Sequence, residues 1–125
     1  MSLQRRKASP PPSNVVDQKT LDEHGVHVFK HQVAGHGSEG AQQDSILATS
    51  DGSRLWKPLN QTEADFYEQL NSSKNDLILK AFAPKFYGTP AMTTESGDTW
   101  RYIETENLTN GFQRPCIIDL KMGTR

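Results

Sequence analysis

The sequence has little cysteine, no long hydrophobic run and almost no net charge. Its single cysteine, Cys116, excludes an internal disulfide framework and a cysteine-rich zinc site. No apolar run approaches the roughly 20 residues that a membrane-spanning helix needs, and the first residues lack the apolar segment of a secretory signal peptide. We therefore expect an intracellular protein, in the nucleus, the cytoplasm or both, without a membrane partner.

Charge and apolar content are both modest for a chain of 125 residues. Fourteen basic residues face fifteen acidic ones, for a formal net charge of −1, which argues against direct nucleic-acid binding through a basic tail. Hydrophobic residues make up 34% and the mean hydropathy is −0.72, so part of the chain should lie outside the packed core. The basic triplet at 5–7 and the prolines at 10–12 assign that part to residues 1–25, a predicted disordered leader.

Residues 26–125 are predicted to form one α+β domain that begins with strands. Val26 and Val28, then residues 46–49 and 54–59, predict a three-stranded antiparallel meander, because β-branched and apolar residues alternate there between turn signals. The pair Asp51-Gly52 is a hairpin signal between the second and third strands. A glycine-rich turn over residues 32–37 is expected between the first and second.

Helices are predicted next. Thr62 and Asp65 have the spacing of a capping box, and Phe66 and Leu70 lie one helical turn apart on its apolar side. A second short helix is expected over residues 76–82, with two small or apolar side chains facing inward, at Leu77 and Ala81.

Three further strands are predicted, over residues 85–89, 100–103 and 115–123. The last of these (PCIIDLKMG) is apolar at both odd and even positions, which is typical of a strand buried on both faces. Asp119 and Lys121 would then point to the same side of the strand. Cys116 should be a buried, inert thiol.

A glycine-rich turn, a strand lysine and a helix glutamate follow one another in this chain. The turn could approach phosphates through its backbone N–H groups, Lys57 could neutralise phosphate oxygens, and Glu63 could pair with Lys57 and hold it in place. Each feature alone is more often a hairpin, a solvated lysine or a partner of the helix dipole. Their order along the chain favours a nucleotide site built like that of a protein kinase small lobe.

Longer motifs make the chain resemble the inositol polyphosphate kinase family. Residues 115–123 match the family signature P-x-x-x-D-x-K-x-G, and residues 31–36 (HQVAGH) match its opening motif. Residues 57–59, 63–68, 84–88 and 106–109 follow in the family's order and spacing, so that the resemblance covers about residues 26–125. The opening motif and the short spacing to residue 106 are most like multikinases, whereas residues 121–125 also resemble inositol hexakisphosphate kinases.

This resemblance implies a fold and a reaction. The fold would be a kinase-like small lobe, an antiparallel sheet with one main helix, followed by the first strand of a larger lobe that the chain lacks. The reaction would be ATP-dependent phosphorylation of an inositol phosphate, with Mg²⁺ bridging the nucleotide phosphates. The missing lobe would carry the metal ligands, so no residue of this chain is predicted to bind metal.

The resemblance also implies a role for each matching residue. Lys57 would contact the ATP phosphates, steadied by Glu63. The Glu106 carbonyl and the Leu108 N–H would pair with adenine as a hinge, through backbone atoms, so that side-chain identity there should matter little. Two residues of the signature would contact the ligands at the reacting end: Asp119 the ribose hydroxyls, and Lys121 the inositol phosphate near the accepting hydroxyl.

Two functions from different classes remain open at this point. The first is a kinase, present here as an N-terminal fragment that is inactive or nearly so alone. The second is a non-catalytic binding or regulatory module, derived from a kinase lobe, that engages an unidentified protein partner through its open face.

Overall fold

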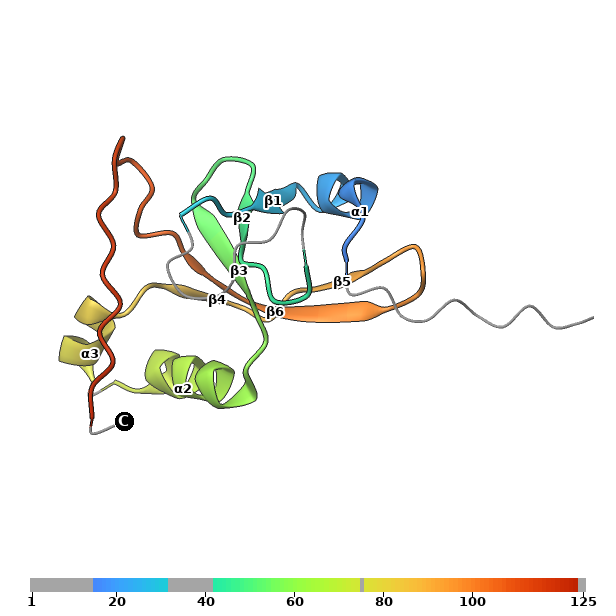
Figure 1. Ribbon diagram of the computed structural model, residues 1–125. Helices are drawn as coiled ribbons and strands as arrows, with labels where there is room; N and C mark the ends of the chain where they lie inside the picture. The colour runs from blue at the N-terminus through green and yellow to red at the C-terminus, as the bar shows by residue number, and fades with distance from the viewer. Residues whose placement is uncertain (1–14, 32–41, 75, 124–125) are drawn as a thin grey trace, which may run out of the picture.

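The structure is a computed structural model that describes residues 15–31, 42–74 and 76–123 (Figure 1). The glycine-rich turn expected over residues 32–37, the first fourteen residues of the leader and the last two residues of the chain lie outside them. The described elements are, in order, α1 Gln18–Glu23, β1 Val26–Val28, β2 Leu47–Thr49, β3 Arg54–Pro58, α2 Gln61–Ser72, α3 Leu77–Phe82, β4 Phe86–Gly88, β5 Ala91–Thr93 and β6 Thr99–Glu106.

The strands form one antiparallel sheet. Neighbours follow the order β1-β2-β3-β6-β4, and β5 pairs with the first residues of β6. This confirms the predicted α+β class and the meander of the first three strands. The strand β5 was not predicted, and it, rather than β4, is the partner that β6 meets across the turn at residues 94–98.

The main core lies on one face of the sheet. It contains Trp56, Trp100 and Tyr102, with 8%, 6% and 1% of their surfaces exposed, and smaller apolar side chains from the other strands. Helix α1 closes this face with Leu21, and Val16 joins it from the preceding residues. Burying these side chains is the main force that holds the sheet together.

Helix α1 corrects the predicted leader, whose boundary was placed near residue 25. Asp17 caps the helix by accepting a hydrogen bond from the Thr20 backbone N–H at 2.8 Å, and Thr20 is itself 2% exposed. A single buried leucine in a six-residue helix gives almost no periodic pattern. The prediction was wrong for residues 15–25 because their order depends on the distant strands that they cover.

Helix α2 lies on the opposite face, below the sheet in Figure 1. Its N-cap is Asn60, whose side chain accepts from the Glu63 N–H at 3.1 Å, and not Thr62 as predicted. Ala64 and Leu70 are its buried residues, whereas Phe66, expected on the apolar side, is 48% exposed. No helix among the described residues has the length and apolar character needed to cross a membrane.

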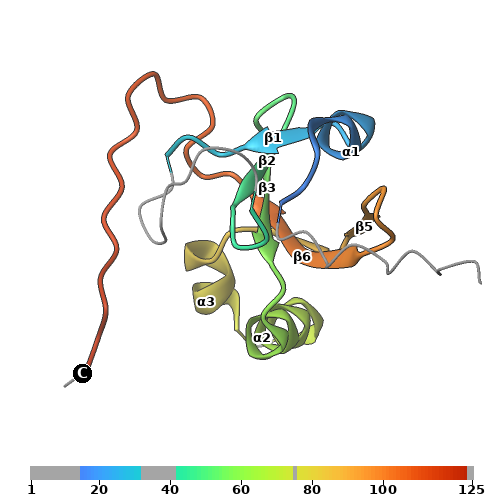
Figure 2. The same cartoon turned by 45° about the vertical axis from the view of Figure 1, so that its right-hand side comes forward.

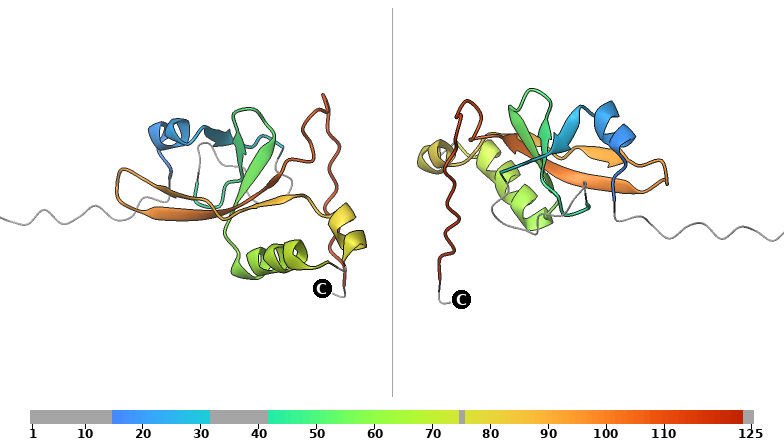
Figure 3. Two further views of the ribbon diagram at one scale, coloured as in Figure 1. Left: turned by 180° about the vertical axis from the view of Figure 1, so that it is seen from behind. Right: turned by 45° about the horizontal axis from the view of Figure 1, so that its top comes forward.

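Two predictions about the later part of the chain are wrong. Helix α3 buries none of its residues, so neither Leu77, which is 71% exposed, nor Ala81 faces inward. Residues 115–123 are extended but pair with no described strand, and they run away from the sheet as a separate arm (Figures 2 and 3). The apolar pattern predicted burial on both faces, but the side chains of residues 116–123 are exposed, and no sheet edge among the described residues lies beside this arm to receive its hydrogen bonds.

Candidate functional site

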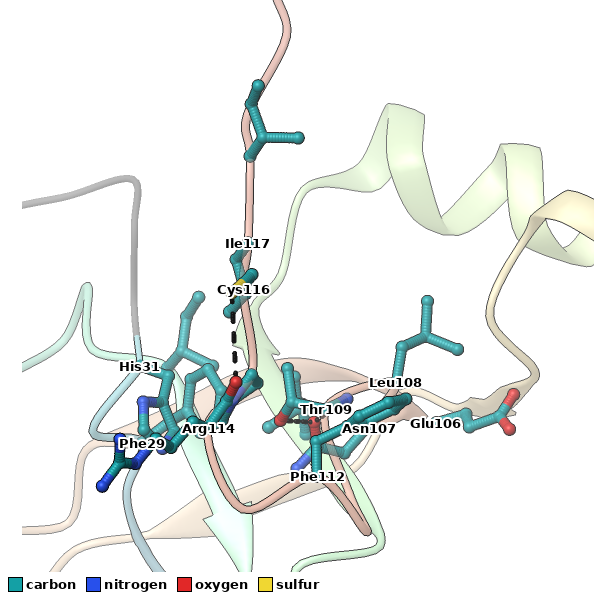
Figure 4. Close-up of a pocket in the computed structure, with 14 residues that line it drawn as sticks. Phe29, His31, Glu106, Asn107, Leu108, Thr109, Phe112, Arg114, Cys116 and Ile117 are labelled. Atoms are coloured by element: carbon teal, nitrogen blue, oxygen red, sulfur yellow. Dashed lines mark hydrogen bonds between the residues drawn. The ribbon is translucent and has the colours of Figure 1, made fainter.

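A cavity of about 840 Å³ lies where the sheet meets the start of the arm (Figure 4). Its walls come from three places: Phe29 and His31 after β1, Ile46 just before β2 with Leu55 in β3, and residues 106–109, 112 and 114–118. Leu55 precedes the core residue Trp56 along β3, so it points to the opposite face of the sheet. The cavity therefore opens on the α2 side of the sheet, away from the main core.

Lys57 lies two residues after Leu55, on the same face of β3. Its Nζ is 2.6 Å from the Oε1 of Glu63, in the first turn of α2, and the two side chains are 38% and 30% exposed. The predicted pairing is thus present. Because Asn60 caps the helix and orients its first turn, the pair holds a lysine ammonium group at a fixed place on the cavity side of the sheet.

The segment predicted as a hinge forms part of the cavity wall. The Glu106 backbone N–H donates to the Lys85 carbonyl at 2.8 Å, and the Glu106 carboxylate accepts from the Lys85 N–H at 3.2 Å. Leu108 is 60% exposed and lines the cavity. Its backbone N–H donates to no acceptor among the described residues, so a ligand could accept from it.

Asn107, which the sequence analysis did not single out, is the buried residue of this segment. It is 7% exposed, and its side chain bonds to the turn between β2 and β3 and to Thr109. The sequence carries one weak sign of this role, since asparagine two residues before threonine, just after a strand, favours a local side-chain turn.

The predicted pair Asp119 and Lys121 is not brought to the cavity. Both residues are exposed on the arm, and neither makes a hydrogen bond or ion pair with the described part of the chain. Residues 115–118, just before them, do line the cavity. Among these is Cys116, which is exposed and not buried as predicted.

Polar groups are placed unevenly around the cavity. Figure 4 places Phe29, His31 and Arg114 on one side and Asn107, Leu108 and Thr109 on the other. No group of three or more histidine, cysteine, aspartate or glutamate residues that could hold a metal ion exists within the described ranges. The arrangement can therefore contact an anion and a hydrogen-bonding ring, but these ranges supply no metal centre.

The pKa of Tyr67, a tyrosine near the Lys57–Glu63 ion pair, is raised. The Tyr67 ring stacks on Phe86 with 5.3 Å between the ring centroids. Burial raises the pKa of Tyr67, and the negative charge of Glu63 raises it further. Tyr67 therefore stays neutral near pH 7 and acts here as a packing group that steadies α2 against β4.

Comparisons with known proteins agree with the sequence motifs. The family described as "Inositol polyphosphate kinase" matches residues 102–125. The human protein named inositol polyphosphate multikinase is 32% identical over 109 residues, which cover 81% of this chain and 26% of the human protein. Inositol polyphosphate multikinase alpha of Arabidopsis thaliana is 30% identical over 106 residues, which cover 80% of this chain and 36% of the relative.

The chain thus spans between about a quarter and somewhat over a third of the length of these two relatives. No solved structure matches it. The similarity to the relatives extends over most of the chain, and the family match over residues 102–125 includes the signature at residues 115–123. The chain belongs to the inositol polyphosphate kinase family.

Proposed function

We propose that this chain is the nucleotide-binding part of an ATP-dependent kinase that phosphorylates inositol phosphates, and that its sheet and α2 correspond to a kinase-like small lobe. The observation that carries the proposal is the Lys57–Glu63 ion pair at 2.6 Å, on the face of the sheet that also holds the cavity. A lysine held by a helix glutamate next to a hinge is the arrangement with which protein kinases bind nucleotide phosphates.

The cavity suits an adenine nucleotide. Its volume of about 840 Å³ falls within the range of roughly 300–1,000 Å³ usual for small-molecule sites. Apolar side chains such as Leu55 and Leu108 form much of the wall, and the free Leu108 N–H offers a donor to a ring nitrogen. In this proposal the base lies against residues 106–108 and the phosphates extend toward Lys57.

The remaining roles rest on the family signature. Asp119 would contact the ribose hydroxyls and Lys121 the inositol phosphate, both from the arm that leaves the cavity wall. The resemblance assigns the Mg²⁺ ligands to a further lobe, and no group of three or more metal-ligating side chains exists within the described ranges. We therefore propose that the 125-residue chain alone transfers little or no phosphate.

The test compares ADP binding by the unchanged 125-residue protein and by its Lys57→Ala variant, measured by calorimetry. Removing a charged hydrogen-bond donor to phosphate should weaken ADP binding by about tenfold or more. Lys19→Ala is the matched control, because Lys19 also lies 2.6 Å from a glutamate, Glu95, but on α1 at the other face of the sheet. ADP binding that is unaffected by Lys57→Ala would contradict the proposal.

A second candidate function is a non-catalytic binding module. It is favoured by the exposed apolar side chains of α3 and of the arm, which include Phe82 at 84% and Met122 at 93% exposure. ADP binding by the 125-residue chain separates the two candidates, because both predict little or no phosphate transfer by this chain alone. A folded chain that binds no ADP would support the module and exclude the nucleotide site.

A further inference from the structure

One buried side chain ties the hinge segment to a distant turn. The Asn107 Nδ2 donates to the Gly52 carbonyl at 2.8 Å, and the Asn107 backbone N–H donates to the Ser53 carbonyl at 2.9 Å. Gly52 and Ser53 belong to the turn that leads into β3, the strand of Lys57. The hinge and the turn are therefore joined through both a side chain and the backbone.

The same side chain shapes the hinge itself. The Asn107 Oδ1 accepts from the Thr109 backbone N–H at 3.1 Å and from the Thr109 Oγ1 at 2.6 Å. These bonds close a local turn around Leu108, in which an asparagine side chain replaces a backbone acceptor. The Asn107 carbonyl accepts from the Asn110 N–H at 3.1 Å and closes a second turn.

These bonds set the direction of the Leu108 N–H. The Asn107 carbonyl and the Leu108 N–H belong to one trans peptide plane, on which they point in opposite directions. Because the carbonyl points into the turn toward Asn110, the Leu108 N–H points out of it. This N–H belongs to a residue of the cavity wall and has no acceptor among the described residues.

The turn to which Asn107 bonds is itself well braced. The Asp51 carboxylate accepts from the Thr49 hydroxyl at 2.7 Å and from the Ser53 N–H at 3.0 Å. Gly52 has a φ of 75°, in the left-handed region that favours glycine. Asn107 is thus bonded to a turn whose own geometry is held by side chains.

From this geometry we infer that Asn107 is a positioning residue for nucleotide recognition: it holds the Leu108 N–H where the nucleotide base accepts from it. The inference rests on the proposed nucleotide site and corrects the expectation that side chains of the hinge matter little. It assigns Asn107 to the base and leaves the phosphates to Lys57.

The experiment compares two ligands on Asn107→Ala in the 125-residue chain: ADP, and inorganic tripolyphosphate, which lacks a base. ADP binding should weaken by about tenfold, because the donor that meets the base is no longer fixed. Tripolyphosphate binding should change less than about twofold, since it does not use the hinge. A loss of general stability would instead weaken both ligands to the same extent.

Thr20→Val is the matched control. Thr20 is 2% exposed and its Oγ1 bonds to Asp17 at 2.8 Å, so this variant also loses hydrogen bonds of a buried side chain, but in α1. It should destabilise the protein without changing the ratio of the two affinities. If Asn107→Ala does not fold, Thr109→Val removes only the bond from the Thr109 hydroxyl and should weaken ADP binding by about two- to threefold.

The outcomes distinguish this inference from the proposed function. ADP bound equally by the unchanged chain and by Asn107→Ala, or an equal loss of both ligands, would overturn the role of Asn107 and leave the nucleotide site intact. No ADP binding by the unchanged chain would overturn the proposed function, and this inference with it. A selective loss of ADP supports both.

Discussion

Strand β6 and the arm at residues 115–123 were both predicted to be strands, but only β6 is paired and buried. Strand β6 contains aromatic and β-branched residues, which are typical of strands, and the arm contains a continuous apolar run with two isoleucines. In β6, Tyr102 and Ile103 are 1% and 0% exposed, whereas Ile118 and Leu120 in the arm are 77% and 69% exposed. The difference teaches that β-like composition indicates a strand only where a neighbouring strand accepts and donates its backbone hydrogen bonds.

The neighbours of β6 explain its burial. It pairs with β3 along five residues and also with β4 and β5, while both of its faces carry packed side chains. The arm begins after the turn at residues 107–110 and leads away from the sheet (Figure 2). An apolar segment of this kind is free to bind another surface.

Hydrogen exchange should show the largest difference between the two segments. Amides of β6 that bond within the sheet should exchange at least about a thousandfold more slowly than intrinsic rates, because exchange there requires opening of the core. Amides of residues 117–122 should exchange at close to intrinsic rates. Mass spectrometry of peptides from both segments measures this, and strong protection of the arm would mean that it is paired in solution.

Truncating one isoleucine in each segment tests the same comparison through stability. Ile103→Ala should reduce the free energy of unfolding by about 2–5 kcal/mol, because it leaves a cavity in a fully buried site. Ile118→Ala should change it by less than about 0.5 kcal/mol. Urea denaturation measures both.

Should Ile103→Ala fail to fold, Ile103→Val should still cost about 0.5–1.5 kcal/mol. Equal effects of the changes at residues 103 and 118 would contradict the burial difference.

A smaller effect is expected at Glu104, which lies opposite Trp56 in the sheet. Its carboxylate accepts from the Trp56 Nε1 at 2.6 Å and from Arg54 at 3.1 Å, and its side chain is 16% exposed. Glu104→Ala should cost about 1–3 kcal/mol, because it leaves the buried indole N–H without an acceptor. Urea denaturation measures this cost, and an unchanged midpoint would show that the bond to Trp56 contributes little.

The exposed Lys19–Glu95 pair provides the control for Glu104. Glu95→Ala should leave the urea midpoint unchanged, since exposed ion pairs contribute little to stability. A comparable loss in both variants would indicate a general effect of removing negative charge and not the buried bond.

Local signals in the sequence were sufficient for much of this fold and for one part of the site. The meander of β1 to β3 follows from alternation and from the turn at Asp51-Gly52, whose partners lie close in the sequence. The Lys57–Glu63 pair joins residues only six positions apart, so the order of a strand lysine and a helix glutamate along the chain was enough to predict it.

The features that the sequence did not reveal depend on distant partners. Helix α1 is ordered by strands that follow it, and Asn107 bonds to Gly52, 55 positions earlier. The arm was predicted as a strand because its composition is apolar, but composition does not specify a pairing partner. Long-range contacts of this kind leave little trace in a local pattern.

The smallest predicted effect is a pH-dependent loss of stability when Asp51, in the turn before β3, is replaced. The same replacement at Asp119 in the arm is the comparison. Hydrogen bonds from the Ser53 backbone, the Thr49 hydroxyl and the Ser53 hydroxyl lower the pKa of Asp51 from 3.8 to about 2. Its ionised form is therefore favoured in the folded state, and this stabilisation is complete above about pH 4 and is lost as the pH falls through 2.

Asp51→Asn should consequently have a lower free energy of unfolding than the unchanged chain at pH 6. This difference in stability should become smaller as the pH falls toward 2. Urea midpoints of both proteins across this pH range measure the difference. Asp119→Asn should leave the urea midpoint unchanged across this range, because Asp119 is exposed and makes no hydrogen bond or ion pair with the described residues. If the stability difference for Asp51→Asn does not vary with pH, the turn depends on the shape of the side chain at residue 51 and not on its charge.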